Sequence, residues 1–234
     1  MKLTLVLLQT LLTAVHVFAL VWEDEELINS IDDQTPELAH CLPNAVCSVV
    51  HRRFWLPPIT QKFCECKGNE ECSMRYQLTL DSKTMQLDSR SQLQFCEPIT
   101  SLPVCEHGQP ALDVKMRTME GSRSGQTVKE VTAIAACTCH WPTYWALHRH
   151  YYTNYFNGTT LAHDYYTCAP LKKCNVDDFC GNLRADIFSA YYQCSCPAGT
   201  LCINNDRSKQ YAAELFYQGP IYRAKCQYLK NQQT

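Results

Sequence analysis

Cysteines are the residues in this sequence whose type and spacing could most readily do chemistry: the chain holds 16 of them in 234 residues. Thiols at this density either bind a metal such as zinc or pair as disulfides. The C-x-C steps would suit a zinc site, but the cysteine count is even and paired C-x2-C knuckles are absent. Between Cys41 and Cys226 the density is roughly 9%, which approaches that of a disulfide scaffold. We therefore expect disulfides and no metal.

The cysteine spacing repeats along the chain, which indicates tandem modules. The first six cysteines follow each other at steps of 6, 17, 2, 6 and 24 residues, and the last six at steps of 6, 14, 2, 6 and 24. Four cysteines remain between these sets: Cys105, Cys137, Cys139 and Cys168. They fit a third copy that lacks the second and fifth cysteines, where Ala111 and Trp145 stand instead.

The missing pair constrains the disulfide connectivity. Loss of one bridge from the middle module implies that positions two and five are partners, since losing one cysteine alone would leave an unpaired thiol. The two cysteines of C-x-C are too close together for an easy bridge, so we do not pair them with each other. Two patterns remain for the other four positions, 1–3 with 4–6 or 1–4 with 3–6. We favour the first, which gives Cys41–Cys64, Cys47–Cys72, Cys66–Cys96, Cys105–Cys137, Cys139–Cys168, Cys174–Cys194, Cys180–Cys202 and Cys196–Cys226.

The domain organisation follows from these spacings. We expect module 1 at residues 41–96, a linker at 97–104, module 2 at 105–168, module 3 at 174–226 and a tail at 227–234. Prolines in the linker and in Ala169–Leu171 favour extended, semi-rigid joints. Modules this small cannot stabilise themselves by burial alone, so the fold class is small, disulfide-rich and mainly β, with 3+2+3 bridges.

The N-terminus predicts export. Lys2 precedes an apolar stretch, and Val17 and Ala19 supply the small residues of a cleavage site, so residues 1–19 are interpreted as a signal peptide. The alternative is an uncleaved anchor. Residues 20–40 carry seven carboxylates and no Lys or Arg, and they form either an acidic propeptide or a solvated tail. We expect a secreted, extracellular and monomeric protein without stable membrane insertion, and a sequon at Asn157 that a glycan could occupy.

Alternating polar and apolar residues predict short hairpins in the spacers. In module 1 we expect strands at 73–80 and 91–96, and in module 2 strands at 113–119 and 127–137. In module 3 the polar stretch 204–209 and a turn at 218–220 are expected. Short helical turns are considered at 161–163 and 211–216.

The sequence was also searched for groups that could bind nucleic acid, catalyse a reaction or hold a metal. Composition gives a formal net charge of −2, which argues against nucleic-acid binding through bulk positive charge. The sequence contains no common hydrolase or nucleotide-binding motif, so we expect neither enzymatic activity nor a cofactor, although a constellation of His51, Asp113 and Ser122 is conceivable. Histidines gather in module 2 and could bind a metal, but we interpret them as exposed residues of an aromatic loop: His140, His148, His150 and His163.

Two aromatic and basic segments are the candidate binding surfaces. Tyr, Trp and Arg dominate binding hot spots, and these types gather at residues 141–166 and 51–55. Trp145 could instead fill the space of the missing bridge. The candidate contact residues are Arg52, Arg53, Phe54, Trp55, Trp141, Tyr144, Arg149, Tyr151 and Tyr152.

The cysteine pattern resembles those of known families. C-x-C-x5-C followed by a long hairpin and a last cysteine is similar to the C-terminal half of the colipase, prokineticin and Dickkopf scaffold, whose pattern also implies 2–5 and 4–6 bridges, although its adjacent Cys-Cys pair is missing here. The layout over 41–226 behind a signal peptide resembles the family-11 scoloptoxins, secreted centipede venom proteins. It also resembles the tandem modules of giant-lens, an insect antagonist of an epidermal growth factor ligand.

These resemblances imply two functions. The first is a venom toxin that places loop residues against an ion channel or receptor. The second is an antagonist that sequesters a growth factor between its modules.

Overall fold

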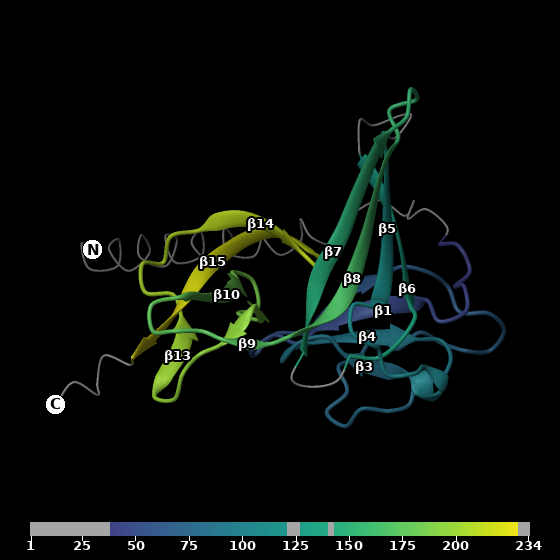
Figure 1. Cartoon of the computed structure of the whole chain (residues 1–234). Helices are drawn as coiled ribbons and strands as arrows, with labels where there is room; N and C mark the ends of the chain where they lie inside the picture. The colour runs from purple at the N-terminus through teal and green to yellow at the C-terminus, as the bar shows by residue number, and fades with distance from the viewer. Residues whose placement is uncertain (1–37, 121–126, 140–142, 229–234) are drawn as a thin grey trace, which may run out of the picture. The chain divides into compact units, whose positions relative to one another are not determined.

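The computed structural model describes residues 38–120, 127–139 and 143–228. Figure 1 shows that its regular structure consists of strands, apart from a short 3-10 turn, η1, at Ile99–Ser101. The predicted signal peptide and nearly all of the acidic leader lie outside the described residues. Within the described ranges there is no helix with the length and hydropathy to cross a bilayer.

The disulfides agree with the expected pairing. All 16 cysteines are bonded, three pairs in the first module, two in the second and three in the third. In the chain-entropy account, each bridge closing a loop of this length stabilises the fold by about 3 kcal/mol. The mainly β, disulfide-rich class with 3+2+3 bridges is therefore confirmed.

The first module is a four-stranded antiparallel sheet in the order β2-β1-β4-β3. Its strands are β1 (Val46–His51), β2 (Ile59–Lys62), β3 (Thr84–Gln86) and β4 (Ser91–Phe95). The strand expected at 73–80 is wrong, because this segment is irregular and its backbone bonds to side chains rather than to a neighbouring strand. Buried Gln92 accepts a hydrogen bond from the Gln77 amide at 2.8 Å and donates to the Gln77 carbonyl at 2.7 Å.

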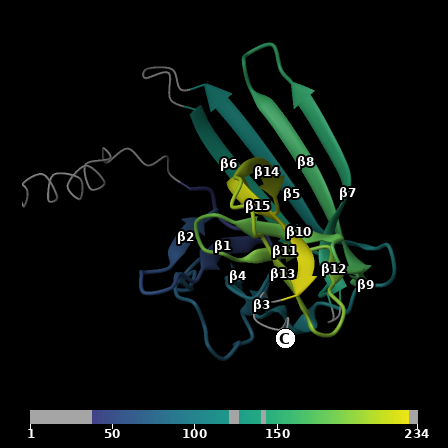
Figure 2. The same cartoon turned by 90° about the vertical axis from the view of Figure 1, so that its left-hand side faces the viewer.

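The second module is a sheet of long strands in the order β6-β5-β8-β7 (Figure 2). Its strands are β5 (Pro110–Glu120), β6 (Thr127–Ala135), β7 (Thr143–Asn154) and β8 (Thr160–Pro170). The β5–β6 hairpin confirms the strands expected around 113–119 and 127–137. The expectation of short strands is wrong here, since β5, β7 and β8 have 11 or 12 residues, and residues 161–163 extend β8 instead of forming a helical turn.

The third module forms a sheet in the order β11-β10-β15-β13, with β14 also paired to β15. Its strands are β10 (Phe179–Arg184), β11 (Ala190–Tyr192), β13 (Thr200–Ile203), β14 (Gln210–Glu214) and β15 (Tyr217–Tyr228), and a parallel pair joins β9 (Lys172–Lys173) to β12 (Cys194–Ser195). The turn expected at 218–220 is wrong, because these residues pair with β14 inside β15. The chain turns at Leu215 and Phe216 instead, so the helical turn considered at 211–216 is also wrong.

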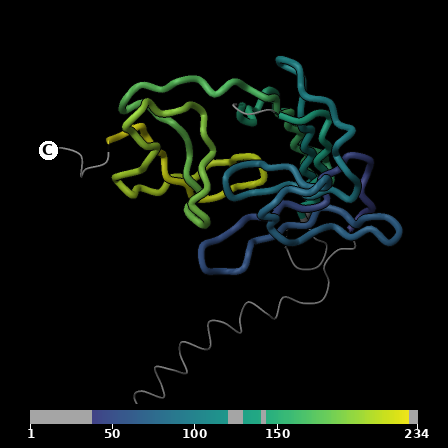
Figure 3. The backbone as a smooth tube through the Cα atoms, turned by 90° about the horizontal axis from the view of Figure 1, so that it is seen from below, coloured from purple at the N-terminus to yellow at the C-terminus, as the bar shows by residue number. Residues whose placement is uncertain are grey.

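One hydrophobic core is shared by the three modules. The apolar face of the first sheet contributes residues such as Leu93 and Phe95, the second sheet adds Leu112 and Tyr166, and Leu215 comes from the β14–β15 turn of the third. The ring of Phe216 also stacks on Phe63 of the first module, with 5.2 Å between ring centroids. Because each module is too small to enclose a core alone, pooling the apolar faces buries more surface than three separate modules could. Figure 3 follows the backbone through these modules in succession.

The joints between modules also contribute to packing. The linker at 97–104 contains η1, so it is not the extended spacer that its prolines indicated, and Ile99 and Leu102 pack against the shared core. A side-chain hydrogen bond from Ser189 to Asp88 connects the third module to the first. The second proline joint is part of β8, which continues through Pro170.

Candidate protein-binding surfaces

The aromatic segment expected at 141–166 lies, from residue 143 on, in a hairpin of β7 and β8. The two strands pair from Thr143↔Pro170 to Asn154↔Thr160, with a bulge between Leu147 and Arg149. β-Branched and aromatic residues favour strands, and their alternation sends successive side chains to opposite faces. The hairpin therefore presents two different surfaces.

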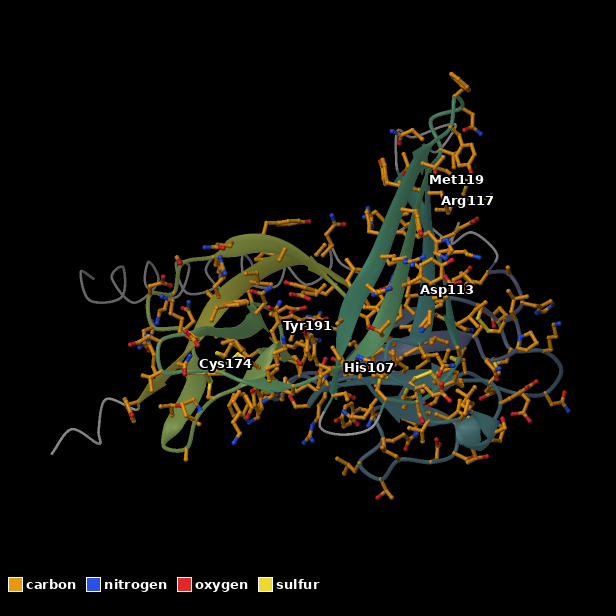
Figure 4. All side chains as sticks on the ribbon, viewed as in Figure 1. His107, Asp113, Arg117, Met119, Cys174 and Tyr191 are labelled. Carbon is orange, nitrogen blue, oxygen red and sulfur yellow. A yellow bond between two sulfur atoms is a disulfide. The ribbon has the colours of Figure 1, made fainter. Side chains whose placement is uncertain are left out.

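One face of the hairpin carries a cluster of rings and charges, defined here as the outer cluster: Asp113, Arg149, Tyr151, His163 and Tyr165. Cross-strand pairing places Arg149 opposite Tyr165 and Tyr151 opposite His163. Tyr151 meets Tyr165 edge to face at 6.1 Å between centroids, and His163 lies 4.3 Å from Tyr165. The imidazole of His163 pairs with the Asp113 carboxylate from β5. Figure 4 labels Asp113 and Arg117, which both lie on β5.

The opposite face of the hairpin is buried near its base and exposed further out. Near the base, Tyr166 packs in the shared core, where burial raises the pKa of its hydroxyl. Half-buried Trp145 packs against the same core, so this residue, at the place of the missing fifth cysteine, has a structural role. Further out, His150 bonds to Asp164 at 2.5 Å and stacks with Tyr152, whose side chain is 58% exposed.

The hairpin ends in a turn that carries the sequon. Asn157 is exposed, and its side-chain oxygen accepts a hydrogen bond from the Thr159 amide at 3.1 Å. Tyr155 and Phe156 beside it are exposed as well. A glycan at Asn157 would be accessible at this turn, six residues beyond Tyr151.

The structure separates the other groups that the sequence singled out for chemistry. His150 and His163 bind different aspartates on opposite faces of β7–β8, and His148 is exposed at the bulge. His51 is buried beside Ser91 and Arg184, whereas Asp113 pairs with His163. Trp141, His140 and Ser122 lie outside the described residues. In the part of the chain that the structure describes, closely spaced sets of potential metal ligands consist of cysteine sulfurs, all engaged in disulfides.

The second predicted surface is the loop that follows β1. Arg52 is exposed, Arg53 is half-buried, and the side chains of Phe54 and Trp55 are 52% and 98% exposed. The guanidinium of Arg90 lies over the Phe54 ring at 3.5 Å from its centroid. This loop and the irregular segment 73–80 enclose an open pocket of about 320 Å³.

Sequence reasoning missed the other half of this pocket. Arg75, Tyr76 and Leu78 line it opposite Arg52 and Arg53. The alternation of residues 73–80 predicts a strand, but the window 72–80 also contains an arginine and no acidic residue, which is a signal of a charged surface. Tyr144, also a predicted contact, is half-buried near the base of β7.

Comparisons with known proteins establish no family. No protein-family model and no curated protein matches this chain. Among solved structures the chain is similar to unliganded Argos, at 19% identity and a TM-score of 0.46, over 82% of this chain and 93% of that one. A likeness of this strength does not establish a shared activity. The resemblance to the family-11 scoloptoxins is not confirmed, and the venom-toxin interpretation gains no support.

Proposed function

We propose that this chain is a secreted, non-enzymatic protein that binds and sequesters a growth-factor-like extracellular polypeptide. The observation that carries the proposal is the outer cluster, a set of rings and charges on a disulfide-bonded sheet in which Arg149 and Tyr151 are exposed and the other three residues are half-buried. The cysteine spacing, which resembles that of giant-lens, favours a growth factor of the epidermal type as the ligand. Eight disulfides suit a protein that works in an oxidising compartment.

The outer cluster has the composition and rigidity of a binding hot spot. Tyr and Arg bring large contact area and directional hydrogen bonds, and they dominate measured interface energies. Tyr151 is fixed against Tyr165, and His163 is fixed by Asp113, so little side-chain entropy remains to be lost on binding. Tyr151 is nevertheless 50% exposed, which leaves much of the ring available to a ligand.

The position of β7 in the sheet adds main-chain contacts. Among the described strands, β7 pairs with β8 on one side only, so it is an edge of the β6-β5-β8-β7 sheet. Edge strands can accept an extended segment of another protein through backbone hydrogen bonds. A ligand strand beside β7 would also contact the Arg149 and Tyr151 side chains.

Binding of an epidermal-growth-factor-type ligand to the full, disulfide-bonded chain tests the proposal. Calorimetric titration should show saturable binding, and Tyr151→Ala should weaken it by about 2 kcal/mol, as loss of a hot-spot residue does. Tyr152→Ala, on the opposite face of the same strand, should weaken it less. Tyr211→Ala, which removes an exposed ring of β14, is the control and should bind like the unmodified protein.

Non-reducing peptide maps should first confirm that each variant keeps the eight disulfides. Absence of binding across a panel of growth-factor ligands would overturn the proposed ligand class. Equal losses in the Tyr151, Tyr152 and Tyr211 variants would overturn the assignment of the outer cluster as the contact surface.

A further inference from the structure

The pocket on the first module combines three arginines with apolar walls. Arg52, Arg53 and Arg75 line it together with Leu56, Tyr76 and Leu78, and its volume is about 320 Å³. The walls are open to solvent, since the side chains of Leu56 and Leu78 are 59% and 84% exposed. Exposed apolar side chains that gather beside polar groups are a feature of ligand- and partner-binding sites.

Hydrogen bonds hold both sides of the pocket in place. On one side, Arg53 Nε donates to the Pro57 carbonyl at 2.7 Å, which closes the loop after β1. On the other side, the Gln92 side chain fixes the backbone of Gln77, and buried Ser48 donates to the Ser73 carbonyl at 2.8 Å. The Arg52 guanidinium also lies 5.7 Å from the centre of the Tyr76 ring, which connects the two sides.

The positive charge of the pocket is not neutralised by the surrounding chain. Among the described residues, none of its three arginines forms an ion pair. Residues 51–63 and 72–80 contain no Asp or Glu. Of the carboxylates that flank residues 72–80, Glu70 pairs with Lys83 and Asp81 bonds to Lys83 and Thr84. In the described part of the chain, Glu71 forms no ion pair with these arginines.

These features together define the chemistry of a ligand. Guanidinium groups match the geometry of sulfate, phosphate and carboxylate oxygens and bind them through paired hydrogen bonds. The apolar walls add contact for a hydrophobic body attached to the anion. A carboxylate on a short side chain lacks such a body, and a sulfated sugar presents hydroxyl groups to the leucines.

We propose that this pocket binds a sulfated tyrosine in an extracellular partner protein, with the sulfate among the arginines and the ring against Leu56 and Leu78. Tyrosine sulfation takes place in the secretory pathway, where the sequence also predicts this chain to be processed. The proposal deepens the proposed function by adding a second contact, and it rests on that function only for the assumption of an extracellular partner.

Direct titration of the full disulfide-bonded chain with peptides tests the pocket. The probe is a fluorescent acidic peptide with one sulfotyrosine, compared with the same peptide carrying unmodified tyrosine. Sulfation should tighten binding at least about tenfold, and Arg75→Ala should remove most of that gain, because charge-assisted hydrogen bonds to the sulfate are lost. Arg75→Lys should restore only part of it, since lysine lacks the planar fork.

Two further variants separate the charge from the apolar walls. Leu78→Ala should weaken binding of the sulfated peptide by about fivefold, because an apolar contact to the ring is removed, while inorganic sulfate should compete equally well in both proteins. Arg223→Ala removes an exposed arginine of β15 that lies over the Phe179 ring, and it should leave peptide binding unchanged.

Several results would overturn the proposal. Equal affinity for sulfated and unmodified peptides would exclude a sulfate site. Tighter binding of a heparin oligosaccharide, weakened equally by Arg75→Ala and Arg223→Ala, would assign the arginines to a polysaccharide surface instead. Preference for a phosphotyrosine peptide over the sulfated one would overturn the choice of sulfate. If only the proposed function were wrong, the chain would bind the sulfated peptide but no growth factor. The two proposals can therefore be tested separately.

Discussion

The guanidinium of Arg184 meets the imidazole of His51 in the interior, although 133 residues separate them in sequence. Nη1 of Arg184 lies 3.2 Å from each ring nitrogen of His51, and each residue is only 3% exposed. Asp186 pairs with the same guanidinium at 2.6 Å, and the ring of Tyr217 lies 4.1 Å from it. A buried cation therefore joins the first module to the third.

This contact keeps His51 neutral. Burial, followed by the nearby charge of Arg184, lowers the pKa of His51 to about 3, while the Asp186 carboxylate opposes the shift. A protonated ring would place a second positive charge beside Arg184 without a hydrogen-bond acceptor for its guanidinium.

Stability should fall as the solution becomes acidic. Below about pH 6.5 His51 takes up a proton in the unfolded chain, whereas in the folded chain it does so only near pH 3. The free energy of unfolding is therefore highest above pH 6.5 and falls as the pH drops from 6.5 towards 3. At pH 5 the loss should be about 2 kcal/mol. Denaturant unfolding with intact disulfides at pH 7.5 and 5.0 measures it. His51→Gln should reduce the difference between the two pH values, whereas His107→Gln, at an exposed site, should retain it; the opposite pattern would contradict the assignment.

Removing the buried cation should destabilise the whole fold. Arg184→Ala leaves the Asp186 carboxylate without its partner and the Tyr217 ring without its cation, at a cost of about 3 kcal/mol. Arg223→Ala removes an exposed cation from the Phe179 ring and should cost less than about 1 kcal/mol. Unfolding free energies of both variants provide the comparison, and similar values would show that the buried junction contributes little.

The buried side-chain amide of Gln92 should keep residues 73–80, one side of the pocket on the first module, in a fixed conformation. Gln92→Leu keeps the side-chain volume but leaves the Gln77 amide and carbonyl without their partners, which should cost about 2–3 kcal/mol. Amide hydrogen exchange should then speed up across 73–80 more than in β10. Gln61→Leu, an exposed position of β2, is the matched control. Unchanged exchange in 73–80 would mean that Gln92 does not hold this segment.

The third module should not accept a side chain at Gly181. A Cβ there would lie 2.4 Å from the Tyr191 carbonyl oxygen, in the ladder that pairs β10 with β11. Gly181→Ala should therefore destabilise the protein by about 2 kcal/mol or more. Gly108→Asn should be tolerated, because the site is open and asparagine adopts positive φ readily. Thermal unfolding of the two variants decides the matter, and equal midpoints would refute the steric argument.

Local patterns predicted the parts of the fold that local forces control. The hairpin of β5 and β6 followed from the alternation around residues 113–119 and 127–137. Residues 218–220 were misread because Gly219 and Pro220 favour turns in isolation, yet they pair with Ala212 and Tyr211 in the structure. The true turn is apolar since Leu215 is buried in a core completed by the first module, and such a distant contact leaves no signal in the local sequence.

The candidate surfaces divide in the same way. Composition indicated Arg149, Tyr151 and Arg52 as exposed contact residues, and the structure exposes all three. Composition did not indicate that Tyr151 and Tyr152 lie on opposite faces of β7 with different neighbours. It also did not indicate that Arg75 lines the same pocket as Arg52. The first relation depends on the register of β7 and β8, and the second on hydrogen bonds from Gln92.

By itself, the sequence determined the fold class and the bridge between the second and fifth cysteines of a module, because cysteine spacing is a one-dimensional pattern and the loss of a pair shows which two cysteines are partners. The structure decided between the two patterns left for the other four positions. Only the tertiary structure decided that three stapled modules share one core and that Arg184 meets His51. Those contacts arise from the combined burial of apolar faces that are too small to be enclosed separately, and burial of that kind depends on the whole chain at once.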